Sequence, residues 1–337
     1  MANNINFNCI QPFQYFIMMI GVSGSGKSTR AEALKDLNGT DWYVLSSDKI
    51  REIDFKNIND QKHNKEVFET MQSKTMNLLK DGFSVIYDAT NLTIKNRKNI
   101  MSQVCTYKKR NPHLITQAYV MRTPFLECLR NNSSRSRTVP LHVLNKQRSN
   151  FQMPLYGEGF DEIILSNYDE DKEYSSCTGY FVDRMKDFNQ ETHYHDFDLL
   201  THQRKTLEYL CQNEILSTPL ERACVLHDYG KLYTKTLNER GEYSYYGHAN
   251  VGTYELLPYV EMLALCGKAN IIRFLHLVNY HMLLFDLEKA NYTTINKYRK
   301  LCGEELWSDL HKLHKADMFA SKKYNEIRKD ENRCLQD

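Results

Sequence analysis

The sequence predicts an α/β domain, with a parallel sheet and flanking helices, followed by an all-helical domain. The chain has 337 residues, which favours two domains at about 150 residues each. In the first half, short apolar runs typical of strands alternate with amphipathic segments, whereas helical patterns dominate the second half. Nine of the 12 histidines follow residue 190, so we expect the two halves to differ in their chemistry.

Four apolar runs are the expected strands of the first domain, and polar or helical sequence follows each of them. They are residues 15–20, 42–45, 83–87 and 114–121. A stretch without acidic residues comes next and forms a local cationic segment, with Arg130, Arg135, Arg137, Lys146 and Arg148. The acid-rich stretch after it is typical of a surface connection. We therefore expect the domains to divide there, into residues 1–170 and 171–337.

The composition is that of a globular protein. Hydrophobic residues make up 41% and charged residues 26% of the chain, which excludes a disordered or low-complexity protein. The formal net charge of +2 gives no basis for wholesale binding to DNA or to acidic membranes. The nine cysteines are scattered, and no apolar stretch reaches the roughly 18 residues of a membrane span. Since no secretory leader is recognisable, we expect reduced thiols and a cytoplasmic location.

A glycine-rich loop follows the first strand and precedes the helix-compatible residues 30–35. Its sequence, GVSGSGKST over residues 21–29, fits the pattern G-x-x-x-x-G-K-[ST]. The glycines let backbone N–H groups point inward, and the following helix N-terminus adds positive potential for phosphates. We expect nucleotide binding by Gly21, Gly24, Ser25, Gly26, Lys27, Ser28 and Thr29. Lys27 would contact the β- and γ-phosphates, and the Ser28 hydroxyl would hold Mg²⁺.

Three polar residues at the same edge of the sheet are candidates for handling the phosphate acceptor. Asp48 and Arg51 follow the second strand, where a carboxylate can accept the proton of an attacking hydroxyl and a guanidinium can orient it. The alternative is a helix N-cap by Ser47 or Asp48, with Arg51 in solvent. Asp88 ends the third strand and could support the metal's water shell, clamp Arg51 or begin a turn.

Motifs over most of residues 13–165 resemble the phage and bacterial 5′-hydroxyl polynucleotide kinases. They are GVSGSGKST, SSDKIR, YDATN, RNNSSRSRTVP and EGFD. The resemblance implies ATP and Mg²⁺ as cofactors, Asp48 as the general base for the 5′-hydroxyl and Arg51 as the residue that positions the acceptor, with Asp88 in support. Arg130 and Arg135 would belong to a lid over the transferring phosphates. The family usually sets its lid arginines four residues apart, so Arg137 stays a rival of Arg135; an exposed basic helix is the alternative to a lid.

The second half carries an ordered series of histidines and aspartates. The series is His202, His227, Asp228, His248, His281 and Asp317. The run Thr218 to Glu221 resembles a capping box with Pro219 at the first helical position, so a short helix should deliver His227 and Asp228 at its end. Asp317 continues an apolar helical stripe, where a carboxylate is costly to bury unless it is paired or bound to a cation. Such nitrogen and oxygen donors suit Mn²⁺, Fe²⁺, Co²⁺, Ni²⁺ or Zn²⁺ better than a thiolate-bound structural zinc.

Over about residues 178–325 this series resembles the HD superfamily of metal-dependent phosphohydrolases. The resemblance makes four residues the ligands of one metal: His202, His227, Asp228 and Asp317. It matches His248 and His281 to the extra histidines of members that hold two metals or bind substrate phosphate, and Lys231 would neutralise phosphate charge. A bound metal would lower the pKa of a water and provide a hydroxide to attack phosphorus. His276 is a rival of His281, although a core histidine is its expected role; His193 and His195 are not expected to be ligands.

The whole chain resembles fused polynucleotide kinase and HD phosphoesterase proteins. This implies healing of RNA or DNA ends: ATP-dependent phosphorylation of a 5′-hydroxyl and metal-dependent removal of a 2′,3′-cyclic phosphate or a 2′- or 3′-phosphate. An RNA ligase acting on the healed ends would be a partner, and no membrane is involved. Two other hypotheses stay open. One is a nucleoside or small-molecule kinase fused to an HD nucleotide phosphohydrolase; the other is a kinase with a non-catalytic, RNA-binding HD module.

Overall fold

The computed structural model describes residues 13–57, 62–135, 137–167, 178–191, 197–239 and 241–321. The chain divides into two compact units that interleave along the sequence. Unit 1 comprises Met1–Gly21, Gly26–Met121 and Glu158–Ser166, and unit 2 comprises Val22–Ser25, Arg122–Gly157 and Asn167–Asp337. The predicted division between residues 170 and 171 lies outside the described residues and stays a prediction.

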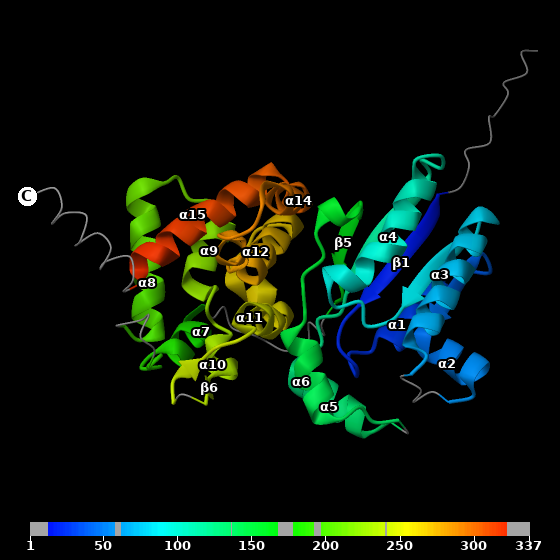
Figure 1. Ribbon diagram of the computed structural model, residues 1–337, viewed down its shortest axis with the longest axis horizontal. Coiled ribbons are helices and arrows are strands. Elements are labelled where there is room, and N and C mark those ends of the chain that lie inside the picture. Colours follow the sequence, from blue (N-terminus) through cyan, green and yellow to red (C-terminus); the bar gives the residue numbers. More distant parts are fainter. Residues whose placement is uncertain are drawn as a thin grey trace, which may run out of the picture. The chain divides into compact units, whose positions relative to one another are not determined.

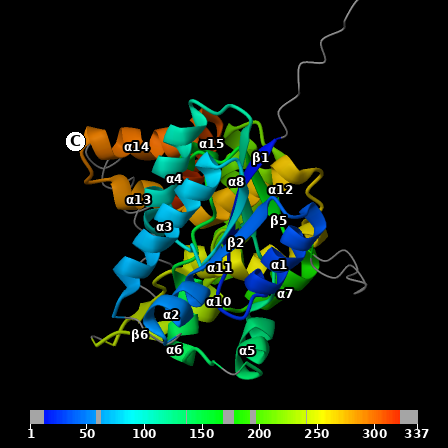
Figure 2. The ribbon, with the colours of Figure 1, turned by 90° about the vertical axis from the view of Figure 1, so that its right-hand side faces the viewer.

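Unit 1 is built on a five-stranded parallel sheet with the order β2-β3-β1-β4-β5 (Figures 1 and 2). The strands are β1 (Gln14–Ile20), β2 (Trp42–Ser46), β3 (Ser84–Asp88), β4 (Leu114–Val120) and β5 (Glu162–Leu165). The first four agree with the predicted runs to within one residue at each end. Helices cover both faces of a parallel sheet, which explains why β1 is a continuous apolar run.

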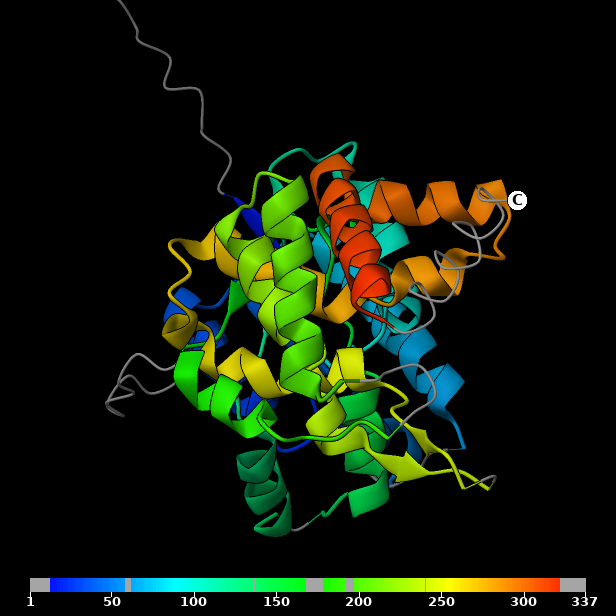
Figure 3. The same cartoon turned by 90° about the vertical axis from the view of Figure 1, so that its left-hand side faces the viewer.

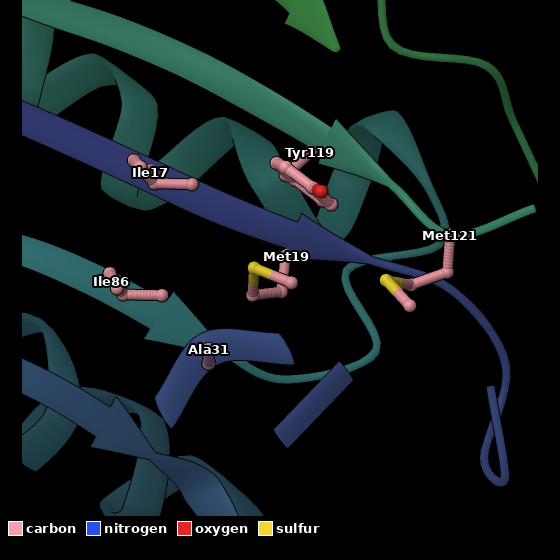
Figure 4. Packing of buried hydrophobic residues seen from close by; sticks show 6 residues of the cluster. All are labelled: Ile17, Met19, Ala31, Ile86, Tyr119 and Met121. Carbon is pink, nitrogen blue, oxygen red and sulfur yellow. The ribbon is translucent and has the colours of Figure 1, made fainter. Parts of the chain in front are cut away.

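Helices α1 (Lys27–Asn38), α2 (Ser47–Phe55), α3 (Asn64–Lys80) and α4 (Ile94–Lys108) connect the first four strands. Successive residues of β1 point to opposite faces of the sheet. Ile17 and Met19 pack with Ala31 of α1 in one cluster (Figure 4). On the other face, Phe16 and Tyr87 have ring centroids 6.0 Å apart, and Tyr87 hydrogen-bonds with Gln72 of α3.

A buried ion pair fastens the segment before β5. Arg97 of α4 is fully buried and donates from Nε and Nη2 to the two carboxylate oxygens of Glu158, at 2.8 Å each. Asp161, at the other end of the EGFD motif, accepts from the backbone N–H and the hydroxyl of Thr116, at 2.7 and 2.8 Å. Both acidic residues of this motif therefore have structural partners within unit 1.

Within its described residues, the regular structure of unit 2 is helical apart from one short hairpin, which the sequence did not predict. The hairpin consists of β6 (Thr236–Leu237) and β7 (Tyr243–Ser244). The helices are α5 (Phe125–Ser133), α6 (Leu141–Ser149), α7 (Thr178–Met185), α8 (Leu199–Asn213), α9 (Thr218–Leu226), α10 (Lys231–Thr234), α11 (His248–Leu256), α12 (Lys268–Tyr280), α13 (Leu283–Leu287), α14 (Tyr292–Cys302) and α15 (Glu304–Ala320), with short 3-10 helices η1 (Tyr156–Glu158), which ends in unit 1, and η2 (Leu257–Leu263).

The core of unit 2 forms where α8, α9, α12 and α15 pack together. Helices α8 and α15 lie side by side, as Figure 3 shows, and α9 contacts both of them. The predicted capping box at α9 is wrong by one position, because the helix begins at Thr218 and its N-cap is Ser217, which makes no side-chain capping bond. The expected helix nevertheless ends next to His227. None of the described helices has the length and hydrophobicity needed to cross a bilayer, and the six described cysteines are free thiols.

Candidate functional site

The glycine loop joins β1 to α1 as predicted, and its backbone requires glycine at two positions. Gly24 and Gly26 have φ angles of 84° and 83°, a region that side chains other than glycine rarely adopt. A Cβ atom on Gly24 would also lie 2.2 Å from the carbonyl oxygen of Cys128. Gly21 donates its N–H to the carbonyl of Thr90 at 3.1 Å. The backbone thus adopts the tight path that phosphate binding by such a loop requires.

The loop meets the end of β3 through a hydroxyl–carboxylate contact. Ser28 donates from Oγ to Oδ2 of Asp88 at 2.7 Å, and Lys27 beside it is buried. Since β1 and β3 are parallel neighbours, the segments after both strands lie at one edge of the sheet. Asp88 therefore lies beside the predicted Mg²⁺ ligand, which supports its role in the metal's water shell rather than that of a simple turn residue.

Asp48 and Arg51 lie one turn apart on α2 and are paired. Arg51 donates from Nη1 to Oδ1 of Asp48 at 3.1 Å and from Nη2 to Oδ1 of Asn64 at 2.7 Å. It is only 6% exposed, whereas the Asp48 side chain is 39% exposed. The alternative of a solvated Arg51 is wrong, and the N-cap of α2 is Ser46 rather than Ser47 or Asp48. The carboxylate is thus accessible and oriented by a buried guanidinium, a suitable arrangement for a general base.

The sequence did not reveal Asn64, because its side chain reaches Arg51 from the start of another helix. Phe68, one turn further along α3, lies beneath the guanidinium, with 6.0 Å from the Arg51 Cζ to the ring centroid. Polar asparagine near a helix start usually serves as a cap, so nothing in the pattern distinguished it. The two α3 residues fix the plane of the guanidinium relative to Asp48.

Helices α5 and α6 carry the predicted lid segment, and they hold the tip of the glycine loop. Gln147 accepts from the N–H of Ser23 at 2.8 Å, and Asn131 donates to the carbonyl of Gly24 at 3.0 Å. The sequence did not single out either side chain. The side chain of Arg130, on α5, is exposed.

The other arginines of the predicted cationic segment differ in their surroundings. Arg135 is exposed and Arg137 is half-buried, and the choice between them as second lid arginine stays a prediction. Arg148 lies over the ring of Phe125 at 4.1 Å and pairs with Glu255 at 2.7 Å, so this member of the segment serves internal packing.

The structure brings together all six members of the predicted histidine and aspartate series. They come from five places in unit 2: α8 (His202), the residues after α9 (His227 and Asp228), the start of α11 (His248), the end of α12 (His281) and α15 (Asp317). Two groups share Asp228: His202 and His227 on one side, and His248 and His281 on the other. In each group the possible ligand atoms lie within 4.8 Å of one another.

Asp228 lies at the centre of this cluster and uses both carboxylate oxygens. Its Oδ2 atom is 3.5 Å from Nε2 of His202 and 3.5 Å from Nε2 of His227. Its Oδ1 atom is 3.1 Å from Nε2 of His248 and 3.5 Å from Nε2 of His281. Asp317 completes the first side, since its Oδ1 atom is 2.9 Å from Nε2 of His202. The cluster is thus two half-sites bridged by one carboxylate.

All four histidines of the cluster are held by their outer ring nitrogens. Each Nδ1 atom lies against a backbone carbonyl. His202 faces Ala320 at 3.4 Å and His227 faces Cys224 at 3.2 Å. His248 faces Tyr245 at 2.9 Å and His281 faces Val278 at 2.8 Å. A carbonyl can only accept, so each Nδ1 carries the proton and a neutral ring has its Nε2 lone pair directed inward. This is the outer-shell arrangement typical of metal-bound histidines.

The inward nitrogens are poorly accommodated without a cation. The Nε2 atoms of His248 and His281 are 3.0 Å apart. If both rings are protonated at Nδ1, two lone pairs face each other at that distance. The Nε2 atom of His227 is buried and makes no hydrogen bond with any described residue. A divalent metal between these atoms would satisfy all of them, so the donor set fits one.

The electrostatics of the cluster keep both carboxylates charged and His281 neutral, whereas the pKa of His227 is raised, because Asp228 and Asp317 outweigh the effect of burial. Burial alone would raise the pKa of Asp228. The neighbouring Lys231 and His227 outweigh this effect and hold the pKa well below its usual range. The pKa of Asp317 is likewise well below its usual range, because the neighbouring imidazoles outweigh burial. Burial lowers the pKa of His281 to about 4, so this ring is neutral at pH 7. Both carboxylates are therefore charged and His281 retains its lone pair.

Lys231 lies inside the cluster, held by residues that the sequence did not indicate. Its Nζ atom is 2.7 Å from Oδ2 of Asp228 and donates to Oε1 of Gln190 at 2.8 Å. Tyr245 donates its hydroxyl to the backbone carbonyl of Gln190 at 2.5 Å. Burial raises the pKa of Tyr245 to about 12, so the hydroxyl keeps its proton. Gln190 and Tyr245 thus fix the position of the one lysine that contacts Asp228 among the described residues.

His276 lies outside the cluster, as expected for a core histidine. Its Nε2 atom is 2.7 Å from the carbonyl oxygen of Pro154, and its ring meets Tyr156 edge-on. On the same helix, Asn279 accepts from the N–H of Met153 at 2.8 Å and donates to the carbonyl of Phe151 at 3.1 Å. His276 and Asn279 of α12 therefore bind the segment 151–156. His281, at the C-terminal end of α12, belongs to the metal cluster instead.

A comparison with protein families matches the first part of the chain. Residues 16–154, from β1 to α6, match the family described as an AAA domain. The match and the parallel sheet with flanking helices fit a P-loop kinase domain. No curated protein matches the chain.

Among solved structures, three similarities are notable. A chain in the structure of the Pnkp1/Rnl/Hen1 RNA repair complex is 21% identical, with 42% of this chain and 45% of that chain covered and a TM-score of 0.35. A second structure of the Pnkp1/Rnl/Hen1 complex gives 23% identity, coverages of 40% and 43%, and a TM-score of 0.31. A gluconokinase from Sinorhizobium meliloti 1021 gives 17% identity, coverages of 46% and 82%, and a TM-score of 0.30. The chain thus spans less than half of the length of the first two relatives.

Proposed function

We propose that this chain heals nucleic-acid ends with two sites, a 5′-hydroxyl kinase in residues 1–170 and an HD-type phosphoesterase in residues 171–337. The observation that carries the proposal is the bridged cluster around Asp228, on a chain that also holds a nucleotide-binding loop. One site would place a phosphate on a 5′-end, and the other would remove phosphate from the opposite end. Together they would convert the ends of a broken strand into ends that a ligase can join.

In the kinase site, the residues at the sheet edge divide the work of phosphoryl transfer. The glycine loop and Lys27 would hold ATP, and Ser28 with Asp88 would hold Mg²⁺ and its water shell. Asp48 would accept the proton of the 5′-hydroxyl, while Arg51, fixed by Asn64, positions the acceptor. Arginines of the lid segment would balance the charge of the transferring phosphate: the exposed Arg130 with either the exposed Arg135 or the half-buried Arg137.

In the phosphoesterase site, the two half-sites would hold one or two divalent metals. One metal would be bound by His202, His227, Asp228 and Asp317, and His248 and His281 with Oδ1 of Asp228 offer a second position. The donor set suits Mn²⁺, Fe²⁺, Co²⁺, Ni²⁺ or Zn²⁺. When bound, such a metal polarises a phosphate ester and lowers the pKa of a water. Lys231 would add positive charge next to the substrate phosphate.

The proposed substrates are RNA or DNA strands with a 5′-hydroxyl and a 2′,3′-cyclic phosphate or a terminal phosphomonoester. An RNA ligase that joins the healed ends is the proposed partner, and a cytoplasmic location is part of the proposal. The exposed arginines of residues 130–137 favour an acceptor that carries phosphates of its own.

The test is incubation with an oligonucleotide that has a 5′-hydroxyl and a 2′,3′-cyclic phosphate, with and without ATP and with each divalent ion. Both ends should change, the 5′-end only with ATP and the other end only with a transition metal. If the protein transfers phosphate to free nucleosides and not to the strand, the first site is a small-molecule kinase and not an end-healing kinase. A metal-loaded protein that binds the strand but leaves the cyclic phosphate intact would show a non-catalytic module.

A further inference from the structure

A pocket of about 400 Å³ opens in unit 2 between α13, α14 and α15. This volume lies within the range of small-ligand sites. None of the residues to which a kinase or phosphoesterase role was given above lines it. Its aromatic and polar lining includes Tyr292, Asn296, Arg299, Trp307, His311 and His314.

Two pocket walls are close in sequence to members of the metal cluster: α13 follows His281, and α15 carries Asp317. His281 precedes α13, and Leu284 in the pocket wall follows three residues later. Asp317 lies three residues beyond His314 along α15. Phe285 and His314 join the two helices, with ring centroids 4.2 Å apart. His314 and Asp317 lie on the same helix, so along α15 the pocket begins about 4.5 Å, or nearly one turn, from a cluster residue.

The lining offers flat aromatic faces together with hydrogen-bonding edges. The ring of Trp307, which is 8% exposed, meets that of His311 edge-on at 5.1 Å, and Tyr292 is 80% exposed at the rim. The Nδ1 atom of His314 is buried and makes no hydrogen bond with any described residue. Asn296 adds an amide. Stacking faces with nearby donors and acceptors are what proteins use to bind an unpaired base.

The charge of the lining argues against a phosphate as the occupant. Apart from histidines, the charged lining residues are Glu288 and Arg299. Arg299 is paired with Glu304 at 2.6 Å. The positive charge available to a substrate phosphate lies instead in the cluster, at Lys231. The pocket thus suits the uncharged part of a nucleotide.

Helix α14 forms one wall of the pocket but buries none of its own side chains. Its start is fixed by Asn291, whose side chain accepts from the N–H of Thr294 at 2.9 Å. A helix without buried residues contributes little to the hydrophobic stability of the unit. Its half-buried Ile295 and Asn296 line the pocket instead.

The geometry points to a nucleoside-binding subsite in this pocket. It holds the base and ribose of the terminal nucleotide, whose 3′-side phosphate is presented to the cluster one helical turn away. The inference rests on the proposed phosphoesterase function, because it assigns the phosphate to that site. It names the substrate class as a nucleotide end rather than a general phosphoester.

Binding can be read from Trp307 itself, because the chain has only two tryptophans. In a Trp42→Phe protein loaded with Mn²⁺, adenosine 3′-monophosphate should change the Trp307 fluorescence saturably, and inorganic phosphate should not. Tyr292→Ala should weaken this binding about tenfold, the loss expected for one stacked ring. Thr293→Ala, its exposed neighbour, should leave it unchanged. Absence of a saturable change, or equal binding by the Tyr292→Ala and Thr293→Ala proteins, would overturn the inference.

A kinetic comparison separates this inference from the proposed function. His311→Ala should raise the KM for a cyclic-phosphate-ended oligonucleotide about tenfold and leave turnover of bis(p-nitrophenyl) phosphate, which has no nucleoside, unchanged. Ser308→Ala, an exposed position on the same helix, is the matched control. An unchanged KM in His311→Ala refutes the subsite and leaves the phosphoesterase function in place. If the parent protein hydrolyses neither substrate, the proposed function fails, and the Trp307 titration alone decides whether the pocket takes a nucleoside.

Discussion

Asp228 is the residue on which the metal site depends most. One of its oxygens faces His202, His227 and Lys231, and the other faces His248 and His281. No other residue type offers two anionic oxygens on so short a side chain. An asparagine would keep the shape but lose the charge that balances Lys231.

The assignment of His281 rather than His276 to the cluster gives a prediction about single residues. His281→Ala should lower the bound metal, because it removes an Nε2 atom 3.5 Å from Oδ1 of Asp228. His276→Ala should leave the metal content unchanged but lower the free energy of unfolding by about 1–3 kcal/mol, since the carbonyl of Pro154 loses its donor. Metal analysis of the purified proteins and thermal unfolding measure the two effects. Metal loss in His276→Ala with full retention in His281→Ala would contradict the assignment.

Sequence reasoning could separate these two histidines only in part. They are five positions apart, which corresponds to about 140° around an α-helix, so only one can face the cluster. Which one does so depends on the packing of residues 151–156 against α12, and that contact spans more than 120 positions. For the same reason Gln190, Asn64 and Tyr245 were not found: each acts on a residue from another element.

The helices of unit 2 bring the cluster together through a close backbone approach. A Cβ atom on Gly230, just before α10, would lie 2.0 Å from the carbonyl oxygen of His248 and 2.6 Å from the N–H nitrogen of Gly252. Gly252, on α11, would in turn meet the N–H nitrogen of Gly230 at 2.8 Å. The two glycines therefore set the distance at which α11 delivers His248 to Asp228.

Gly230→Ala should push α11 away from the cluster. We expect about 2 kcal/mol of destabilisation from the overlap, together with reduced metal binding through His248. Gly179→Ala is the control, because a Cβ atom at that α7 position meets nothing within 4 Å. Thermal unfolding and metal analysis check both proteins. A Gly230→Ala protein with unchanged stability and metal content would show that the approach is not required.

In unit 1, Asp161 fastens β5 to β4, and this contact should depend on pH. Burial alone would raise the pKa of Asp161. Lys108 and the hydrogen bonds from Thr116 outweigh this effect and hold the pKa below the usual 3.8. A carboxyl group with a lowered pKa in the folded state stabilises the fold above its unfolded pKa and loses this contribution as the pH falls. Its contribution is therefore complete at pH 7 and disappears below about pH 4.

Asp161→Asn should accordingly destabilise unit 1 by about 1 kcal/mol at pH 7, because its partly exposed charge is screened. The difference from the parent protein should shrink as the pH falls below 4. Urea unfolding followed by Trp42 fluorescence in a Trp307→Phe background reports on this unit. Glu162→Gln, the neighbouring exposed carboxylate, is the control. A difference that grows on acidification would show that Asp161 has a raised pKa.

The long elements were predictable and the short ones were not. Four strands were found to within a residue because each contains an apolar run; β1 and β3 are buried on both faces, whereas β2 is mostly half-buried and its Tyr43 is exposed. Strand β5 has four residues and begins with an exposed glutamate, and each strand of the β6–β7 hairpin has two, so neither leaves a readable pattern. Helix periodicity marked His202 and Asp317, but the set of six was predicted from the resemblance of its order to the HD superfamily.

Across the whole chain, the two sites draw on separate sets of residues. The candidate kinase residues at the sheet edge, Lys27, Asp48 and Asp88, belong to unit 1, and every member of the metal cluster belongs to unit 2. The kinase candidates Gly24, Ser25, Arg130 and Arg135 lie in unit 2 as well, but none of them is a member of the cluster. We therefore expect each activity to survive loss of the other.

The most direct measurement uses one oligonucleotide that carries a 5′-hydroxyl and a 2′,3′-cyclic phosphate, treated with paired variants. Lys27→Ala should reduce 5′-phosphorylation by about 100-fold or more while the cyclic phosphate is still removed. Asp228→Ala should leave 5′-phosphorylation intact and abolish removal of the cyclic phosphate. Loss of both reactions in either folded variant, or a cyclic phosphate that the parent protein never removes, would contradict a chain that repairs both ends at two independent sites.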